Sequence, residues 1–385
     1  MEFTYLDNAS TTAIDPEVLD AMMPYLKENF GNASSIHSFG KSAKVLLEDA
    51  RDTVANYIGA SSKEIFFTNS GTESNNFAIK GLAFNFLNSG KNHIVSASIE
   101  HSAVIDTLNF LENKFRFEVT FIKPTPEGII LPEKIRSAIK ENTFLVSVMH
   151  SNNETGLIND VKGISDLILD KDIFLHTDSV QSIGKTDFNV NGLNIDSATI
   201  SAHKIYGPKG IAALYVKDKT PVEKFMHGGM QERNMRGGTE NIASVAGFKK
   251  AIELLVDNFR KDTAHYNALK NYLTGKLKSI YGESIIFNSG GSDSLPNIVN
   301  ISFDKNKLEY DEEMILIMLD LKGIAVSGGS ACTAGTHKPS HVLTEIGLDK
   351  KTALGSVRIS FGRYNTEGDI DKFVNALGEI VHPEL

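Results

Sequence analysis

Cysteine is nearly absent from the sequence, since Cys332 is the only one among 385 residues. A single thiol forms neither an intrachain disulfide nor a cysteine-based metal cluster, which suits a reducing compartment. No apolar stretch approaches the roughly 20 residues that span a bilayer, and residues 1–7 lack the basic and apolar regions of a secretory signal. We therefore expect a cytoplasmic protein without membrane association.

Motifs for metals and nucleotides are also missing. Neither HExxH nor CxxC occurs, and the histidines do not fall at ligand spacings, so we expect no metal site. No two glycines stand two positions apart, which excludes GxGxxG, and residues 39–42 end like a P-loop but have Ser35 where its first glycine is required. The net charge of −9, without a basic run, argues against nucleic acid as a direct partner.

The pattern of apolar runs predicts an α/β fold. The runs that predict strands lie at residues 65–68, 94–97, 117–122, 144–149, 173–175, 198–200 and 211–216. Helical or loop stretches separate most of them, which indicates a mostly parallel sheet flanked by helices. After Gly238, long helices at 242–255 and 265–280 lead to a smaller α+β set. We expect a large domain of residues 16–257 and a small domain of residues 1–15 and 258–385.

Lys204 lies in a stiff loop, Ser-Ala-His-Lys-Ile-Tyr-Gly-Pro-Lys-Gly at residues 201–210, between two predicted buried strands. A lysine amine held in a dry cleft has a lowered pKa and can form a Schiff base with a carbonyl compound. The alternative is an ordinary solvated lysine, which is the common case for this residue type.

Three more segments carry candidate residues at the ends of predicted strands. Gly71 and Thr72 lie at a strand-to-helix junction that suits an anion, although a plain helix cap would look alike. Asp178 follows an apolar strand, where it is either a helix cap or a carboxylate that keeps a pyridine nitrogen protonated. His101 is either a histidine satisfied by the backbone or one that stacks on a flat ring and moves protons.

The remaining candidates concern a substrate carboxylate and a nucleophile. Asn153 lies in a polar turn after a strand, and Arg358 could pair with a carboxylate through two hydrogen bonds or simply lie at the surface. Cys332 lies in a loop rich in glycine and serine, where an exposed thiol is a candidate nucleophile and an incidental free thiol is the alternative.

Taken together, these stretches resemble the cysteine desulfurases of the NifS/IscS type, in the class V aminotransferase group of fold-type I pyridoxal-phosphate enzymes. The matching segments follow the family's order along nearly the whole chain, at residues 5–9, 30–38, 71–76, 152–156, 176–181, 201–210, 235–239 and the loop around Cys332. Segment 176–181 reads His-Thr-Asp-Ser-Val-Gln, which differs from the family's usual form only at packing positions.

The resemblance implies a role for each matching residue. Lys204 would carry pyridoxal 5'-phosphate, Asp178 would pair with its ring nitrogen, and His101 would stack on the ring. The remaining cofactor contacts would be Gln181 to the phenolic oxygen, Gly71, Thr72, Ser201 and His203 to the phosphate, and Thr239 to the phosphate of the neighbouring subunit. Asn153 and Arg358 would hold the substrate carboxylate, and Cys332 would receive the sulfur.

The activity implied is conversion of L-cysteine to L-alanine, with the sulfur left as a persulfide on the enzyme. The resemblance further implies a homodimer and a sulfur-acceptor protein, either an iron–sulfur scaffold or a tRNA-thiolating enzyme. A selenocysteine lyase or another class V pyridoxal enzyme is the nearest alternative. A cofactor-free scaffold that only binds acceptor proteins is the alternative from another class.

Overall fold

The computed structural model describes residues 3–290, 293–328 and 338–383. Its main feature is a sheet of seven strands, with β8 antiparallel to both neighbours and the other strands parallel to one another. In spatial order the strands are β2 (Ile65–Thr68), β8 (Ala212–Val216), β7 (Ser197–Ser201), β6 (Phe174–Asp178), β5 (Thr143–Ser147), β3 (His93–Ala97) and β4 (Glu118–Ile122). The expected mostly parallel sheet is confirmed.

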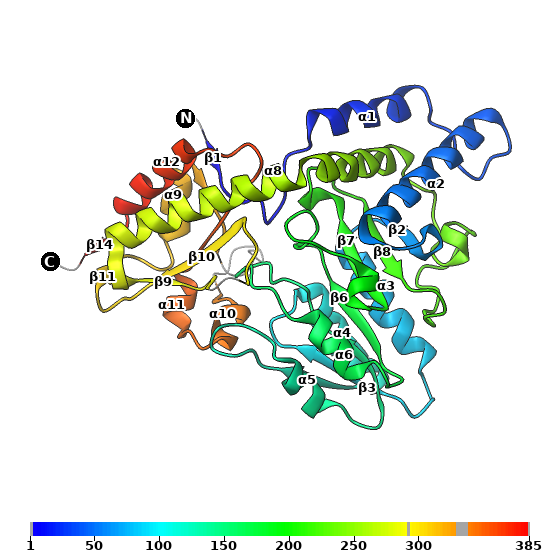
Figure 1. Cartoon of the computed structure of the whole chain (residues 1–385), viewed down its shortest axis with the longest axis horizontal. Coiled ribbons are helices and arrows are strands. Elements are labelled where there is room, and N and C mark those ends of the chain that lie inside the picture. The colour runs from blue at the N-terminus through cyan, green and yellow to red at the C-terminus, as the bar shows by residue number, and fades with distance from the viewer. Residues whose placement is uncertain (1–2, 291–292, 329–337, 384–385) are drawn as a thin grey trace.

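Helices flank this sheet and begin at side chains that cap them (Figure 1). The Asp15 side chain accepts a hydrogen bond at the start of α1, and Pro16 occupies its first turn, where no amide donor is needed. Helix α2 ends at Gly59, whose φ of 75° suits glycine. The helices of this part are α1 (Pro16–Lys27), α2 (Ser38–Ile58), α3 (Gly71–Asn85), α4 (Ser102–Phe115), α5 (Pro132–Ala138), α6 (Val161–Ile168) and α7 (Val190–Leu193).

Helix α8 (Ile242–Tyr281) corrects one expectation from the sequence. The two helices expected at 242–255 and 265–280 form one continuous helix of 40 residues. Residues 256–264 contain neither glycine nor proline, so nothing in the backbone chemistry ends the helix there. Figure 1 shows α8 running from the side of α1 and α2 to the strands and helices of the C-terminal part.

The C-terminal part is built on a three-stranded antiparallel sheet, in which β10 (Ile298–Phe303) lies between β9 (Ile285–Phe287) and β13 (Val357–Ser360). The N-terminal strand β1 (Thr4–Tyr5) joins this part by pairing with β12 (Ile324–Ala325). Its other elements are β11 (Leu308–Glu309), α9 (Ile315–Leu321), α10 (His341–Glu345), α11 (Lys350–Leu354), α12 (Glu367–Gly378) and β14 (His382–Pro383).

Buried apolar side chains form separate clusters in the two parts. One cluster consists of Leu6 and residues between 266 and 381. Another consists of residues between 18 and 255 together with Val342. On this basis we retain as a proposal the division into a large domain, 16–257, and a small domain, 1–15 and 258–385.

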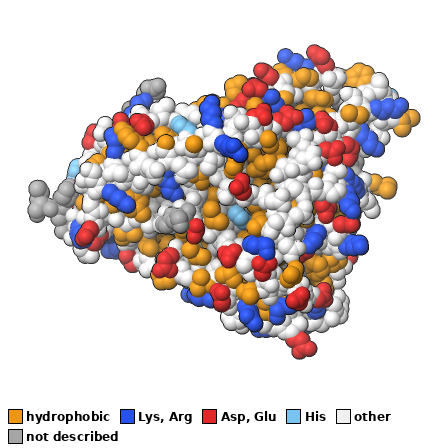
Figure 2. All heavy atoms as spheres, viewed as in Figure 1, with side chains coloured by type: hydrophobic (Ala, Val, Ile, Leu, Met, Phe, Trp, Pro, Cys, Tyr) orange, Lys and Arg blue, Asp and Glu red, His pale blue; other side chains and the backbone are white. Residues whose placement is uncertain are grey.

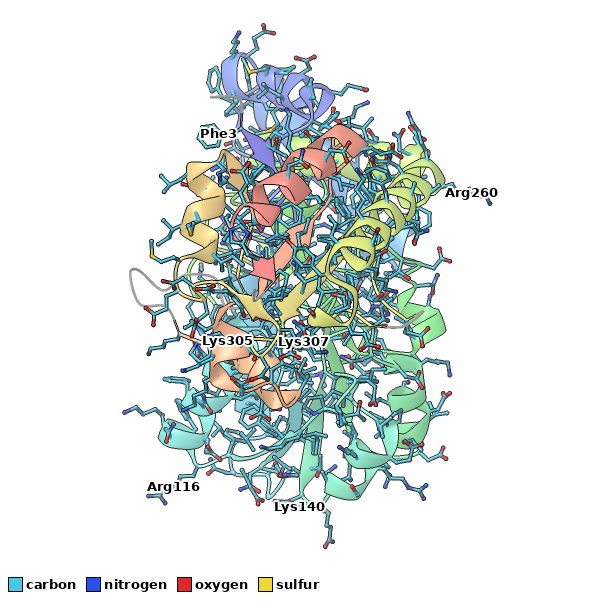
Figure 3. The ribbon with its side chains drawn as sticks, turned by 90° about the vertical axis from the view of Figure 1, so that its left-hand side faces the viewer. Phe3, Arg116, Lys140, Arg260, Lys305 and Lys307 are labelled. Carbon is cyan, nitrogen blue, oxygen red and sulfur yellow. The ribbon has the colours of Figure 1, made fainter. Side chains whose placement is uncertain are left out.

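The carboxyl ends of the parallel strands face the interior of the molecule. Arg116 and Lys140 precede β4 and β5 in the chain, and Figure 3 shows both side chains at the lower extremity of the molecule. The opposite strand ends therefore point toward the C-terminal part, which is where ligands bind in open α/β sheets. Among the described helices, none is both long and apolar enough to cross a bilayer.

Candidate active site

Lys204 lies in the short helical turn that follows β7, and the N-terminal segment of the chain fixes this turn. The Thr12 side chain accepts a hydrogen bond from the Tyr206 amide at 2.8 Å and donates one to the His203 carbonyl at 3.1 Å. Tyr206 adopts a left-handed conformation with a φ of 66°, which is costly for an aromatic residue and must be held by its surroundings. The turn therefore presents Lys204 in a defined position.

Lys204 is half-buried, and its amine is surrounded by polar groups. Its Nζ donates to the carbonyl oxygens of Ala9 and Ser10, both at 2.6 Å. Burial and, to a smaller extent, the positive charge of Arg358 lower the pKa of Lys204 to about 8, against the opposing charges of Asp7 and Asp178. An amine with this pKa is partly neutral near physiological pH, which is what proton transfer and reaction with a carbonyl compound require.

Asp178 ends β6 and takes part in a buried chain of hydrogen bonds. Its Oδ2 accepts from the Asn75 side-chain amide at 2.7 Å, and its Oδ1 accepts from the Val180 amide at 3.0 Å. The Asn75 Oδ1 lies 3.1 Å from Nε2 of His176, whose pKa burial lowers to about 4. A neutral His176 thus supports Asn75, and Asn75 in turn orients the carboxylate of Asp178.

The N-terminus of α3 forms another wall of the site, with Ser70 as its capping residue. A Cβ atom at Gly71 would lie 3.8 Å from Cβ of Ser201, so the end of β7 approaches the helix closely. The Ser201 Oγ is buried and has no hydrogen-bond partner within the described residues. An unpartnered hydroxyl beside a helix N-terminus fits a bound phosphate group.

Two further predicted residues, His101 and Gln181, lie near Lys204 and Asp178. The His101 Nδ1 accepts from the Ala103 amide at 3.1 Å, so this ring caps α4 and its remaining surface is exposed. Gln181 donates from its side-chain amide to the Ala9 carbonyl at 2.9 Å. His203 is half-buried, and burial lowers its pKa to about 4.

Arg358 on β13 brings the C-terminal part into the site. Its guanidinium donates to the Asn153 carbonyl at 2.7 Å, to Asp7 Oδ1 at 2.8 Å and to Ser10 Oγ at 2.6 Å. Its Nε is buried and unpartnered among the described residues. Arg358 is therefore an ordered cation with a donor still free, beside the polar side chain of Asn153.

These side chains meet around one cavity of about 300 Å³, which is at the lower end of the range for small-molecule sites. The predicted residues that line it are Gly71, Thr72, His101, Asn153, Asp178, Gln181, Ser201, His203, Lys204 and Arg358. Thr239 is exposed and does not line this cavity. Cys332 lies outside the described residues.

Several residues of the site were not assigned a role from the sequence. Asn75 lies four positions after Gly71, and a helical spacing of four would have placed both on one face. The carbonyls of Ala9 and Ser10 contact Lys204 across 195 and 194 positions of the chain. No local pattern predicts such a contact, because backbone carbonyls occur at every position.

The residues present fit pyridoxal phosphate. The cavity combines a lysine of lowered pKa, a carboxylate oriented by Asn75, and an unpartnered hydroxyl beside a helix N-terminus. These groups suit, respectively, the aldehyde, the ring nitrogen and the phosphate of that cofactor.

Comparison with known proteins agrees with this arrangement. A model of the family described as Aminotransferase class-V matches residues 4–373. Cysteine desulfurase IscS of Dictyoglomus turgidum is 43% identical over 377 residues, which cover 98% of this chain and 94% of that protein. The chain belongs to the cysteine desulfurases of the class V aminotransferase family. This membership confirms the expected enzyme class and its dependence on pyridoxal phosphate.

Other relatives of this cysteine desulfurase support the same placement. Cysteine desulfurase IscS of Methanosarcina thermophila is 42% identical, with 98% of this chain and 91% of that protein covered. A solved NifS-like protein has a TM-score of 0.90 at 34% identity and covers 98% of each chain. SspA, solved in complex with cysteine, has a TM-score of 0.82 at 37% identity and covers 94% of this chain and 100% of that one. The expected fold class is therefore confirmed.

Proposed function

We propose that this enzyme takes the sulfur of L-cysteine onto Cys332 and releases L-alanine, and that the residues lining the cavity bind the cofactor and the substrate. The observation that carries the proposal is the convergence of Lys204, Asp178 and Arg358 on a single cavity. Lys204, Asp178 and the wall formed by Gly71, Thr72, Ser201 and His203 would hold the cofactor. When bound, pyridoxal phosphate supplies an electron sink for charge that develops on the substrate.

Arg358 and Asn153 would bind the carboxylate of cysteine. The free Nε–H of Arg358 is available for a charge-assisted hydrogen bond, which is stronger than a neutral one. Its bonds to Asp7 and Asn153 already fix the guanidinium, so little side-chain freedom is lost when substrate binds. The α-carbon of the substrate is thereby directed toward the Lys204 amine.

Lys204 would move the proton of the α-carbon. Its lowered pKa leaves a substantial neutral fraction near pH 8, and a neutral amine accepts a proton where an ammonium cannot. His101, which also lines the cavity, would assist in this proton transfer.

Cys332 would act as the nucleophile toward the substrate sulfur. An S–S bond forms between Cys332 Sγ and that sulfur while the carbon–sulfur bond of the substrate breaks. The electron pair of the broken bond leaves with the three-carbon product, which takes up protons to become L-alanine. The atoms balance as cysteine plus enzyme thiol giving alanine plus enzyme persulfide, and the thiolate is the reactive form.

A Cys332→Ser variant tests this assignment. We expect the variant to bind pyridoxal phosphate normally, as seen in its absorbance, but to form no persulfide detectable by mass spectrometry and to transfer no sulfur. Transfer to an acceptor protein at the wild-type rate would show that another group receives the sulfur. Assaying selenocysteine beside cysteine in the wild-type enzyme separates desulfurase from lyase activity.

The acceptor of the sulfur would be a protein, either an iron–sulfur scaffold or a tRNA-thiolating enzyme. The IscS names of the curated relatives support a place in sulfur delivery without distinguishing these two uses. Incubating the persulfide form with candidate acceptors and following the sulfur by mass would distinguish them. We further propose that the enzyme is cytoplasmic, in keeping with its single cysteine.

We also propose that the enzyme is a homodimer in which Thr239 contacts the cofactor phosphate of the neighbouring subunit. Exposed apolar side chains on α1, α2 and the segment between them support an interface there: Leu19, Leu26, Phe30, Ile36 and Val45. Figure 2 shows apolar side chains at the end of the molecule where Figure 1 places these helices. Light scattering that returned the 42.1 kDa mass of one chain would contradict the proposal.

A further inference from the structure

Glu154 is a buried acid next to Asn153, a residue that lines the active-site cavity, and the proposed mechanism assigns Glu154 no role. It follows Asn153 in the chain and is only 2% exposed. Burial raises the pKa of Glu154 to about 8, although a hydrogen bond with Ser340 and the charge of Arg358 both act to lower it. Glu154, which is buried next to Asn153, therefore contacts Ser340 in a distant segment of the chain.

The distant segment is the start of α10. Ser340 Oγ donates to Glu154 Oε2 and accepts from the Leu343 amide at 3.1 Å, so this serine joins Glu154 to the first turn of the helix. His341 Nε2 donates to the Glu100 carbonyl at 3.0 Å, in the segment that also carries His101.

Helix α10 is attached to the large part of the molecule along its whole length. Ser98 Oγ donates to Glu345 at the end of the helix, at 2.9 Å. Val342 belongs to the same hydrophobic cluster as the central sheet, whereas Leu343 packs in a separate cluster with Ala353 of α11. The helix therefore bridges the two parts of the molecule.

The described residues on either side of the segment that carries Cys332 contact the residues proposed to bind substrate or their neighbours. Before it, Ser327 exchanges backbone hydrogen bonds with Arg358, with N···O distances of 3.2 and 2.7 Å. After it, Ser340 contacts the residue next to Asn153. Arg358 and Asn153 are the two residues that would bind the substrate carboxylate. The contact before the segment is therefore with Arg358 itself, and the contact after it is with Glu154, the neighbour of Asn153.

We propose that Glu154 is a positioning residue for sulfur transfer, because its buried carboxyl group holds Ser340 and α10 in place and so fixes where the Cys332 segment rejoins the fold. This inference rests on the proposed role of Cys332. Glu154 touches neither substrate nor cofactor in this scheme, so its loss slows the step at Cys332 and leaves cysteine binding intact.

Glu154→Ala and Glu154→Gln test the proposal together. We expect Glu154→Ala to speed hydrogen exchange in residues 340–347 about tenfold and to slow persulfide formation on Cys332 by a similar factor. We expect the KM for cysteine to stay within about twofold. Gln keeps a neutral group able to accept from Ser340, so it should restore both rates. Cys332 is the only thiol, so mass spectrometry reports on it alone.

The control is Glu232→Gln, a change at another buried acid, whose partner Arg51 belongs to α2, which lies away from α10 in Figure 1. It should weaken the fold without changing exchange in residues 340–347 relative to other helices. If Glu154→Ala does not fold, Ser340→Ala removes the same contact and should give the same two results.

Wild-type exchange and persulfide formation in Glu154→Ala would overturn the proposal, as would a Gln variant as impaired as the Ala variant. Sulfur transfer by Cys332→Ser would instead refute the proposed function, whatever Glu154 does. The exchange measurement needs no substrate, so it keeps these two failures apart.

Discussion

Lys204, which is half-buried, and Lys185, which is buried, have similarly lowered pKa values but different surroundings. Burial lowers the pKa of each to about 8. Lys204 Nζ has two carbonyl acceptors at 2.6 Å and lines the cavity. Lys185 Nζ has a weak acceptor in the Lys204 carbonyl, at 3.5 Å, and lies 5.5 Å from the ring centroid of Tyr266. Burial is the main cause of the lowered pKa of both lysines, but Lys204 lines the active-site cavity and Lys185 does not.

The position of Lys185 explains why such a lysine is tolerated. Aromatic rings offer a cation their negative faces, and the Tyr206 ring centroid lies 6.0 Å away. Tyr206 shares a hydroxyl contact of 3.0 Å with Tyr266 of α8 and accepts from the Arg363 amide at 2.5 Å. Lys185 therefore packs at the junction that holds the Lys204 turn against the C-terminal part.

Replacing each lysine in turn should give the largest contrast. We expect Lys204→Ala to lower the rate of alanine release by about 10²- to 10⁴-fold, because the group proposed to move the α-proton is gone. Lys185→Met should keep a rate on the order of the wild type, since Lys185 does not line the active-site cavity. Initial rates with L-cysteine measure both. Equal loss in the two variants would show that Lys185 also takes part in the chemistry.

Replacing the arginine near each lysine, Arg358 near Lys204 and Arg363 near Lys185, should distinguish the two sites further. Arg358→Gln removes the proposed carboxylate partner, so we expect the KM for cysteine to rise about 10- to 100-fold. It should also raise the pKa of Lys204, which Arg358 lowers. Arg363→Gln is the matched control, because Arg363 lowers the pKa of Lys185 instead. The pH dependence of kcat/KM measures the change in the pKa of Lys204 in each variant. A normal KM in Arg358→Gln would contradict the carboxylate assignment.

Local sequence patterns made Lys204 a candidate, with an exposed lysine as the alternative, but gave no sign that Lys185 is buried. Lys204 follows a buried strand and precedes a glycine and proline turn, so its surroundings can be read from its neighbours. Lys185 is buried by Tyr206 and Tyr266, and the second of these is 81 positions away on α8. Its own segment, Gly-Lys-Thr-Asp, is that of an ordinary exposed lysine.

The fold and the rest of the site show the same contrast between features set by neighbouring residues and features set by residues far apart in the chain. The alternation of strands and helices predicted the mostly parallel sheet, because its periods are local. The single helix α8 was missed, although residues 256–264 lack any breaker, because the apolar pattern weakens there. Asn75 was missed as the partner of Asp178, since these residues lie 103 positions apart and meet only in the folded chain.

The pH dependence of stability offers the finest test of the comparison. In the folded chain burial lowers the pKa of Lys185 from 10.5 to about 8. Between these pH values the unfolded chain holds a proton that the folded chain has released, so this lysine makes stability rise with pH, by about 1.4 kcal/mol per unit. Its contribution is fully present above pH 10.5 and is lost as the pH falls through about 8.

Lys185→Met should remove this rise of stability with pH. Lys204 is present in both proteins, so its own contribution cancels when the variant is compared with the wild type. Urea unfolding of the cofactor-free protein at several pH values from 8 to 10 measures it. The exposed Lys171→Met variant controls for the lost charge, and parallel curves for wild type and Lys185→Met would mean that the Lys185 amine keeps its proton when buried.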